Sequence, residues 1–395
     1  MISPFSIARL PRIQFGAGAI AKLPDLAARY GHRVLLVTGA QSFDAAPYAA
    51  PLLAKLAERG LSCERVMVRG EPSPELVDAA VRDGRDAEID VVIGLGGGSA
   101  LDAAKAIAGL LRPGNSVMDH LEGVGPELPY RGPPTPFIAV PTTAGTGSEA
   151  TKNAVLSRHG PDGFKKSFRD EALVAEIALV DPELLAGCRP VLIAANGMDA
   201  LTQLIESYVS TGANAFTDAL ALSGLRAARD GLLAWYDGGA AAKEAMTQMA
   251  YASLQSGICL AQTGLGAVHG LASPLGAYFP IGHGVVCGTL LAAATRINLE
   301  ALRTRAPQAH ALAKYAEIGR LLSGCEGANA DEDCDNLVAT LEDWTQRLAL
   351  PSLTSLGVNA SDVDRIVGAS RGSSMKTNPI VLSDDEIRQV LEARL

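Results

Sequence analysis

The stretch "GLGGGSALDAAKAIAGLL", residues 94–111, decides the fold of the first half of the chain. An apolar run that begins at Val91 precedes it, and the glycines at 96–98 come directly before a segment with the character of a helix. Glycines let a backbone approach a phosphate closely, and a helix N-terminus offers unpaired N–H donors at the positive end of the dipole. A strand, a triple-glycine turn and a helix in this order predict a nucleotide-phosphate site. Ser99 is expected to cap the helix, with Asp102 in its first turn.

A second loop, "PTTAGTGSEAT" at residues 141–151, also follows an apolar strand. Its threonines and serine supply hydroxyl groups, and its two glycines allow unusual backbone conformations. Two such loops at the carboxyl ends of strands suit a nucleotide in the crevice of a doubly wound sheet. Tight turns without a ligand are the alternative for both loops.

The organisation around these loops predicts two domains. Apolar runs at 33–39, 91–97 and 137–143 alternate with amphipathic stretches such as 73–87, which is typical of a parallel sheet with helices on both faces. From about Pro190 the spacing of apolar residues becomes helical throughout. We therefore expect an α/β dinucleotide-binding domain with a parallel sheet over residues 1–186 and an all-α metal and substrate domain over 187–395. Near the end, Ser383 followed by "DDEI" predicts a helix N-cap.

Candidate metal ligands lie in the second half. "GMDALTQLIESYVS", residues 197–210, places Asp199 and Gln203 four residues apart, on one face of a helix. "AVHGLASPLGAYFPIGHGV", residues 267–285, contains His269 and His283, each followed by glycine. Two histidines and one carboxylate are a recognised ligand set for a divalent metal. Histidines buried in the core for packing alone are the alternative.

Composition and charge exclude several classes of function. The chain has 395 residues, of which 48% are hydrophobic and 19% charged, and a formal net charge of −9. An acidic chain is a poor partner for nucleic acids or anionic membranes. The six cysteines form no CxxC pair, and neither a signal peptide nor a long uninterrupted apolar stretch is evident. We expect a cytoplasmic protein with free thiols and no membrane span.

Together, "GGGSALDAAK", "PTTAGTGSEAT", "GMDALTQLIESYVS" and "HGLASPLGAYFPIGHG" resemble motifs of the iron-containing (group III) alcohol dehydrogenases. The resemblance runs from "RIQFGAGAIAKLP" to "TNPIVLSDDEI" and so covers nearly the whole chain. It implies the fold shared with dehydroquinate synthase, with the active site in the cleft between the two domains. It also implies an NAD(P)-dependent oxidoreductase that interconverts a small alcohol and its aldehyde or ketone by hydride transfer, in a homo-oligomer such as a dimer.

The resemblance further implies a divalent metal, Fe²⁺ or Zn²⁺, held by one aspartate and three histidines. Asp199, His269 and His283 match three of these ligands, whereas the remaining ligand histidine falls on Gln203. Glutamine is a weaker ligand than imidazole, and so its Oε1 or a water would fill the fourth place. A further family histidine near the substrate falls on Ser273, and Ser273 or water would then relay the proton.

For the cofactor, the resemblance places Gly39 where an aspartate marks a preference for NAD, and glycine there permits NADP. No cationic side chain that would grip a 2′-phosphate is obvious beside it. The remaining positions carried over from the family are Gly97, Gly98, Ser99 and Asp102 for the pyrophosphate, Thr142, Thr143, Thr146 and Thr151 for the adenine-ribose and nicotinamide sides, and Lys166 for the nicotinamide ribose.

Three other functions are compatible with the motifs. The first is a metal-independent carbonyl reductase, similar to maleylacetate reductases, that polarises its substrate by hydrogen bonds alone. The second is a lyase resembling dehydroquinate synthase, which would need more cationic side chains than the second half offers near its motifs. The third is a nucleotide-binding protein without catalysis, motivated by Gln203 and Ser273.

Overall fold

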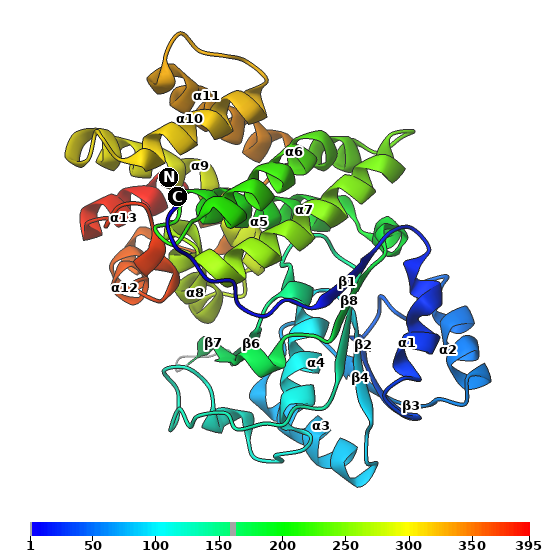
Figure 1. Cartoon of the computed structure of the whole chain (residues 1–395). Helices are drawn as coiled ribbons and strands as arrows, with labels where there is room; N and C mark the ends of the chain where they lie inside the picture. Colours follow the sequence, from blue (N-terminus) through cyan, green and yellow to red (C-terminus); the bar gives the residue numbers. More distant parts are fainter. Residues whose placement is uncertain (1, 159–162) are drawn as a thin grey trace. The chain divides into compact units, whose positions relative to one another are not determined.

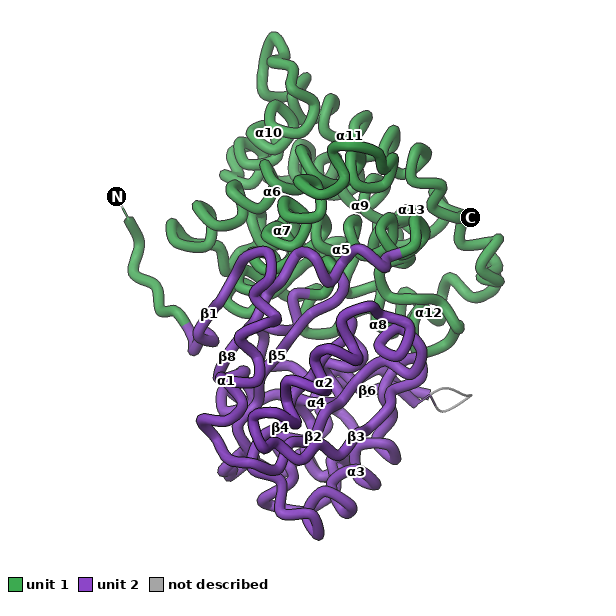
Figure 2. Tube along the Cα trace, turned by 90° about the vertical axis from the view of Figure 1, so that its right-hand side faces the viewer, with its two compact units in different colours: residues 1–7, 144–146, 189–395 green, residues 8–143, 147–188 purple. Residues whose placement is uncertain are grey.

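The structure is a computed structural model that describes residues 2–158 and 163–395 (Figure 1). The chain divides into two compact units, which Figure 2 colours separately. The α/β unit comprises residues 8–143 and 147–188, and the helical unit comprises 189–395 with the short segments 1–7 and 144–146.

The α/β unit is built on a six-stranded sheet in the order β1-β8-β5-β4-β2-β3. Every neighbouring pair in this sheet runs parallel. The predicted apolar runs form three adjacent inner strands, β2, β4 and β5, which confirms the doubly wound parallel sheet. The strands are β1 (Arg12–Phe15), β2 (Arg33–Gly39), β3 (Ser62–Val68), β4 (Val91–Gly96), β5 (Phe137–Pro141) and β8 (Ile177–Val180).

Helices cover both faces of this sheet because alternate residues of each strand point to opposite sides. Leu35 and Val37 of β2 pack in one core cluster with α3 (Pro74–Asp86) and α4 (Gly98–Leu110). Val34 and Leu36 of the same strand pack in a second cluster with α1 (Leu23–Ala27) and α2 (Ala49–Glu58). A strand that is buried on both faces reads as a continuous apolar run, which is why the sequence located these strands.

An antiparallel hairpin lies outside the six-stranded sheet. β6 (Asn153–Arg158) pairs with β7 (Phe164–Arg169), with Asn153 opposite Arg169 and Arg158 opposite Phe164. The sequence analysis did not predict this hairpin. Burial alternates only over residues 153–156 of the hairpin, and the hairpin carries no glycine-rich strand–turn–helix pattern that would mark it.

The helical unit contains the predicted all-α arrangement. Its helices are α5 (Pro190–Val209), α6 (Ala215–Asp237), α7 (Ala242–Thr263), α8 (Ala267–Tyr278), α9 (His283–Arg305), α10 (His310–Ser323), α11 (Ala330–Arg347), α12 (Val363–Ala369) and α13 (Asp384–Glu392). Short 3₁₀ turns connect elements in both units: Ala19–Lys22, Val117–Asp119, Ser148–Ala150, Glu171–Leu173, Pro182–Gly187, Thr354–Leu356, Ala360–Asp362 and Ser374–Thr377. Ser383 caps α13 and forms a capping box with Glu386, as the sequence predicted.

Two helices form the centre of the helical unit. Every residue of α5 from Gly197 to Val209 is buried, and α6, α7 and α9 pack around this helix. A helix that is buried on all sides belongs to the core. α9 is long and apolar enough to cross a membrane by composition, with a mean hydropathy of 1.4, but 83% of its most apolar window is buried inside the unit. α5 and α9 together carry most of the candidate metal ligands.

Candidate active site

Asp199 and Gln203 lie one turn apart on α5, and both side chains are almost fully buried. The amide Nε2 of Gln203 donates a hydrogen bond to Asp199 Oδ1 over 3.1 Å. Its Oε1 accepts a hydrogen bond of 2.7 Å from Ser256 on α7. Turning the amide over would bring its oxygen against the carboxylate. This orientation turns an NH₂ group, which has no lone pair for a metal, toward Asp199, and so it does not support the predicted role of Gln203 Oε1 as a fourth ligand.

His269 on α8 is oriented by a second carboxylate of α5, which the sequence analysis did not identify. Its Nδ1 lies 2.7 Å from Glu206 Oε2, and the other oxygen of Glu206 accepts the backbone N–H of Val268 over 2.7 Å. A carboxylate at Nδ1 holds the proton there and leaves the Nε2 lone pair available. Nε2 lies 3.4 Å from Asp199 Oδ1. Glu206 is seven residues after Asp199 and so occupies the same face of α5, a spacing that would have revealed it.

The start of α8 fits closely around Glu206. The backbone N–H of Ala267 donates to Asn378 Oδ1 over 3.1 Å, so that two side chains from elsewhere cap this helix. A Cβ atom on Gly266 would lie 2.8 Å from Asn378 Oδ1 and 2.9 Å from Glu206 Oε1. Glycine at this position lets α8 begin where His269 meets Asp199.

His283 is the first residue of α9, and the glycine that follows it has a packing role. A Cβ atom on Gly284 would lie 2.5 Å from the carbonyl oxygen of Ala195, and so only glycine lets the first turn of α9 lie against α5. This contact brings His283 Nε2 to 3.8 Å from Asp199 Oδ1. The two imidazole rings are 5.3 Å apart at an angle of 58°. The structure therefore brings together the three side chains that the sequence selected.

Cys287 joins this group, although the sequence analysis treated it as one of six scattered cysteines. Its Sγ lies 3.7 Å from Nε2 of His269 and 3.7 Å from Nε2 of His283. One donor atom from each of Asp199, His269, His283 and Cys287 lies within 4.8 Å of the other three. Cys287 follows His283 by four residues, the spacing of neighbours on one helix face, and this signal was present in the sequence.

The charges in the cluster favour a cation. Burial raises the pKa of Asp199, but His283 and His269 outweigh this effect and hold it below its usual value. Burial lowers the pKa of His269, whereas Cys287, Glu206 and Asp199 together hold it well above its usual value. Burial raises the pKa of the Cys287 thiol to about 12. The carboxylates of Glu206 and Asp199, which favour a proton on His269, would equally favour a divalent cation in its place, and a coordinating thiol is deprotonated by the metal itself.

The residues present fit a divalent metal. Asp199 Oδ2 is buried and has no hydrogen-bond partner in the described part of the chain, an arrangement that costs about 1–3 kcal/mol or more for a polar group and is rare in folded proteins. The other donors of the cluster are imidazole nitrogens and a thiol, which bind transition metals in preference to magnesium or calcium. A metal would bind the lone pairs of these donor atoms, which point toward one another and cannot form hydrogen bonds between themselves without a proton.

Ser273 lies on α8 one turn after His269 and is half-buried. Residues four apart share a helix face, and so Ser273 lies on the side of α8 that carries His269. Its proposed part in proton transfer stays a prediction.

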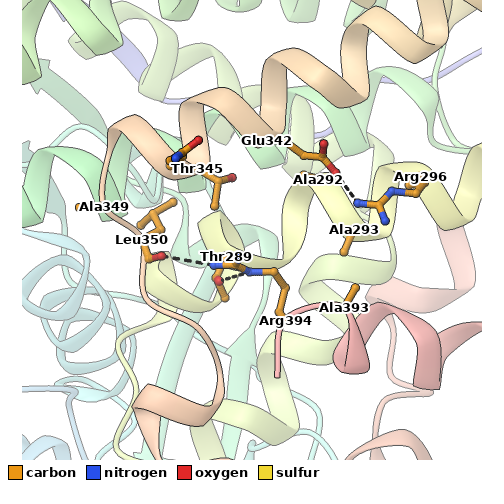
Figure 3. Close-up of a pocket in the computed structure, with 11 residues that line it drawn as sticks. Thr289, Ala292, Ala293, Arg296, Glu342, Thr345, Ala349, Leu350, Ala393 and Arg394 are labelled. Carbon is orange, nitrogen blue, oxygen red and sulfur yellow. Dashed lines mark hydrogen bonds and ion pairs between the residues drawn. The ribbon is translucent and has the colours of Figure 1, made fainter.

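A separate hollow of about 550 Å³ lies in the helical unit, at the meeting of α9, α11 and the C-terminal end (Figure 3). Its charged side chains are matched locally: Arg296 pairs with Glu342, and Arg394 donates to Thr289 Oγ1 over 2.9 Å and to the carbonyl of Leu350 over 3.3 Å. The four cluster residues do not line it. The hollow therefore offers no reactive group to compete with the cluster as the site of chemistry.

In the α/β unit, the triple-glycine turn leaves its helix end open. The N-cap of α4 is Gly97, in extended conformation, and no side chain makes a capping hydrogen bond, so that Ser99 does not cap this helix as predicted. Gly98 is the first helical residue. A Cβ atom on Gly96 would lie 2.7 Å from the Cβ of Ala100, which shows that this glycine lets α4 start directly over the strand end. An uncapped first turn directed away from a strand end suits an anion.

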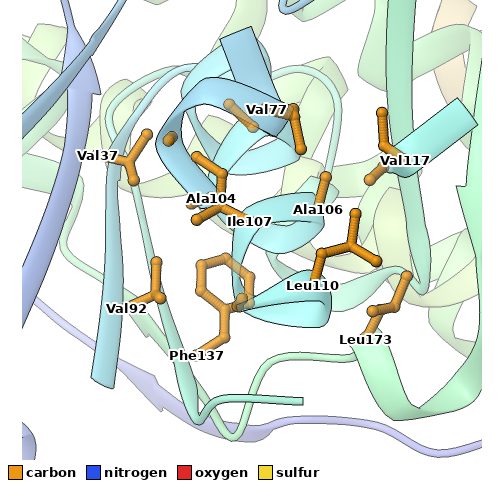
Figure 4. Close-up of a cluster of buried hydrophobic side chains, with 14 of the residues drawn as sticks. Val37, Val77, Val92, Ala104, Ala106, Ile107, Leu110, Val117, Phe137 and Leu173 are labelled. Carbon is orange, nitrogen blue, oxygen red and sulfur yellow. The ribbon is translucent and has the colours of Figure 1, made fainter. Parts of the chain in front are cut away.

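The turn rests on a rigid base. Ile107 and Leu110 of α4 pack against Val37, Val92 and Phe137 of the sheet, in a cluster whose members are nearly all fully buried (Figure 4). Close packing of this kind fixes the direction in which α4 points its first N–H groups.

Asp102 faces the interior of the unit, beyond the first turn of α4. Its Oδ1 accepts from Ser148 Oγ, its Oδ2 accepts the backbone N–H of Val155 over 3.2 Å, and Lys105 Nζ lies 3.8 Å away. Burial raises its pKa. Both oxygens are thus engaged by the protein, in bonds that join α4 to the segment after β5.

Lys105 strengthens the same connection and was missed by the sequence analysis. The fully buried Nζ donates to the carbonyl of Ser148, to its hydroxyl, to Thr151 Oγ1 and to the carbonyl of Asn153, all within 3.1 Å. Burial lowers its pKa to about 8. Thr151, a predicted cofactor contact, is accordingly buried as an acceptor for Lys105.

Thr142 and Thr143 lie beside the glycine turn, as expected. The backbone N–H of Thr142 donates to the carbonyl of Gly96 over 2.9 Å, and a Cβ on Gly97 would lie 3.2 Å from Thr143 Cγ2. Thr146 belongs instead to the 144–146 segment of the helical unit. Lys166 lies on β7 of the α/β unit.

A cation contacts Thr38, the residue before Gly39 at the end of β2. Arg65 Nε, on the neighbouring strand β3, donates to Thr38 Oγ1 over 3.0 Å, and its guanidinium pairs with Asp44 at 2.6 Å. The guanidinium also lies 4.7 Å from the centre of the Phe43 ring. The sequence analysis expected no obvious cation here because Arg65 reaches this position through strand pairing, not through proximity in the sequence.

Comparison with known proteins identifies the family of the chain. The N-terminal family model described as iron-containing alcohol dehydrogenase matches residues 11–182, and the C-terminal model of the Fe-containing alcohol dehydrogenase family matches residues 193–395. Alcohol dehydrogenase 4 of Saccharomyces cerevisiae is 30% identical over 382 residues, which cover 96% of this chain and 95% of that protein. An NADPH-dependent butanol dehydrogenase of Clostridium saccharobutylicum is 30% identical over 97% of this chain and 96% of its own length. The crystal structure of a 1,3-propanediol oxidoreductase superposes with a TM-score of 0.89 at 27% identity, and all of both chains is covered.

Proposed function

This chain belongs to the iron-containing alcohol dehydrogenase family and is an oxidoreductase that interconverts an alcohol and its aldehyde, and from this premise we propose how its residues divide the work. The α/β unit, which matches the predicted domain 1–186 except at 1–7, 144–146 and 187–188, binds NAD(P), and the helical unit, whose main part lies within the predicted 187–395, binds the metal and a small alcohol or aldehyde. The observation that carries this proposal is the convergence of Asp199 Oδ1 with Nε2 of His269 and of His283.

In the helical unit, Asp199, His269 and His283 hold the divalent metal. Gln203 keeps the Asp199 carboxylate in place through its amide, and Glu206 keeps His269 in the tautomer that presents Nε2. When bound, the metal supplies Lewis-acid polarisation of the substrate oxygen. Ser273, on the same helix face as His269, is in place to pass a proton to or from water.

In the α/β unit, the open first turn of α4 binds the pyrophosphate through the backbone N–H groups of Gly98 and Ser99. Thr142 and Thr143 lie at the same strand ends and contact the remaining cofactor atoms. The nicotinamide, when bound, gives or accepts the hydride. Asp102 and Lys105 act indirectly, because they tie α4 to the loop that carries these threonines.

Among the alternatives, a metal-independent reductase gains no support from the cluster. Hydrogen-bond polarisation of a carbonyl needs donors that point at the substrate, whereas Asp199 Oδ2 is an acceptor without a donor in the described part of the chain. A carboxylate left in this state favours a cation beside it.

The family and the thiols support a proposal for assembly and location. We propose a homo-oligomer, and a cytoplasmic protein in which the six free cysteines stay reduced.

The test is to remove the metal with a chelator, to reload the protein with Zn²⁺ or Fe²⁺, and to follow oxidation of NADH and of NADPH with a panel of short aldehydes. We expect aldehyde-dependent oxidation by the reloaded protein and its loss from the stripped protein. Absence of turnover with either cofactor in metal-loaded protein would overturn the proposal.

A further inference from the structure

Cys287 differs from the other buried cysteines in what its sulfur contacts. Cys259 Sγ lies 3.6 Å from the carbonyl of Thr217, and Cys334 Sγ lies 3.6 Å from that of Leu312, as expected for thiols that donate their single proton to the backbone. Cys287 Sγ instead lies between two imidazole nitrogens, at 3.7 Å from each. The thiol has one proton to donate and its sulfur is only a weak acceptor, and so hydrogen bonds alone satisfy two imidazole nitrogens poorly at this contact.

Four of the six distances between the donor atoms are close to those of a tetrahedral metal site, and all of the donor atoms lie within 4.8 Å of one another. Metal–nitrogen and metal–oxygen bonds of about 2.0–2.1 Å and a metal–sulfur bond of about 2.3 Å place neighbouring donors roughly 3.3–3.6 Å apart. From Asp199 Oδ1 to the two Nε2 atoms the distances are 3.4 and 3.8 Å, and from the sulfur to the same atoms they are both 3.7 Å. Contraction of the cluster would bring the four donors to a common ion.

The helices explain how a fourth ligand can change position. α5 carries Asp199 and Gln203 at positions i and i+4, and α9 carries His283 and Cys287 in the same relation. On α5 the i+4 side chain is committed to Asp199 and Ser256, whereas on α9 the i+4 side chain points at both histidines. We infer that the thiolate of Cys287 is the fourth metal ligand, in the place that Gln203 leaves, and that the resulting site selects zinc over iron. This inference rests on the metal-assisted function proposed above.

The choice of zinc follows from the donor set. Thiolate is a soft ligand that favours Zn²⁺, and Zn²⁺ accepts tetrahedral sulfur, nitrogen and oxygen ligands without a preference imposed by its d electrons. Asp199 and a Cys287 thiolate also carry two negative charges, which balance a divalent ion. A set of one aspartate and three histidines carries only one.

The decisive experiment uses cobalt(II) alone on the full-length protein after removal of its metal. Cobalt occupies tetrahedral zinc sites and shows a thiolate-to-cobalt charge-transfer band in the near ultraviolet only when sulfur is bound. We expect this band in the native protein, its loss in Cys287→Ser and its retention in Cys259→Ser, which changes a buried cysteine outside the cluster. Native protein that binds cobalt without the band would overturn the inference.

Affinity provides a second measurement. Loss of outer contacts around a metal typically costs 10–100-fold in affinity, and so loss of a ligand in Cys287→Ser should weaken zinc binding by more than about 100-fold. The double variant Gln203→His with Cys287→Ser moves the fourth ligand back to α5, and we expect it to regain cobalt without the charge-transfer band. Zinc affinity that is unchanged in Cys287→Ser, or a band that persists in the double variant, would contradict the inference.

Aldehyde reduction in the same preparations separates this inference from the proposed function. If the protein reduces aldehydes in a metal-dependent way but shows no sulfur band, the proposed function stands and Cys287 is not a ligand. If the protein shows the band, Cys287→Ser abolishes it and no aldehyde is reduced, Cys287 is a ligand and the proposed function is wrong.

Discussion

The metal cluster of the helical unit and the triple-glycine turn of the α/β unit are sites of opposite construction. The cluster is made of side chains from three helices, and its ligands at 199, 269, 283 and 287 are far apart in the chain. The turn is made of consecutive backbone groups, from the end of β4 to the first turn of α4. A backbone site is specified locally, whereas a side-chain cluster depends on how helices pack.

This difference has a consequence for substitution. A ligand on α5 can be lost and one on α9 gained, because both helices face the same point. The glycine turn allows no such exchange. If an added side chain displaced the backbone of the turn, no neighbouring group could replace the lost N–H donor. The two sites should therefore fail in different ways when each is altered.

The largest expected effect comes from Asp199→Asn. Loss of the carboxylate removes the metal, and with it several kcal/mol of charge stabilisation in the transition state, so that kcat/KM should fall by roughly 10³-fold. Binding of NAD(P)H to the α/β unit should be unchanged. Metal content, steady-state rates and fluorescence titration with the reduced cofactor measure the three quantities. Equal loss of cofactor affinity would show that the two sites are not independent.

Glu206→Gln should weaken the metal site without removing a ligand. Glutamine is neutral and has only one acceptor oxygen, whereas Glu206 accepts hydrogen bonds from both His269 Nδ1 and the N–H of Val268. We therefore expect metal affinity to fall by about 10–100-fold. Competition with a chromophoric chelator measures the change. Glu317→Gln, which alters a carboxylate paired with Tyr208 in the same unit, is the control and should leave metal affinity unchanged.

Sequence predicted the local features of both sites more reliably than the long-range ones. The predicted strand at 33–39 coincides with β2, and the strand–turn–helix order around the glycines is confirmed. Three cluster residues were identified because motifs carry them. Cys287 was missed although its spacing from His283 was visible, because a lone cysteine has many structural explanations. Arg65 was missed because only the pairing of β2 with β3, in which it lies opposite Leu36, brings its side chain to Thr38 beside Gly39.

The roles of individual polar groups were the least predictable part. Gln203 and Asp102 were assigned to ligands in the sequence, yet each has its polar atoms engaged by other side chains or backbone groups of its own unit. A sequence shows which side chains can bind a ligand, whereas their hydrogen-bond partners depend on elements that fold up around them.

Gly96→Ala tests the backbone site. The added Cβ would lie 2.7 Å from the Cβ of Ala100, closer than carbon atoms pack, and α4 must shift away from the strand end. We expect a loss of about 1 kcal/mol or more in stability and about tenfold in NAD(P)H affinity. Thermal unfolding and cofactor titration measure these effects. Gly187→Ala, at a position with no atom within 4 Å of the new Cβ, is the matched control.

Asp44→Asn should produce the smallest change, in the preference between cofactors. Asp44 now neutralises Arg65 beside Gly39, and removal of its charge leaves a guanidinium free to pair with a 2′-phosphate. Hydrogen bonds to charged groups contribute about 1.5–3 kcal/mol when well formed, but Arg65 is partly exposed, and so we expect a shift of only about fivefold toward NADPH over NADH. The ratio of kcat/KM values for the two cofactors measures it, and Arg65→Ala should move the ratio in the opposite direction. If Arg65→Ala and Asp44→Asn shifted the ratio alike, the 2′-phosphate would lie elsewhere, and specificity at this strand end would rest on Gly39 alone.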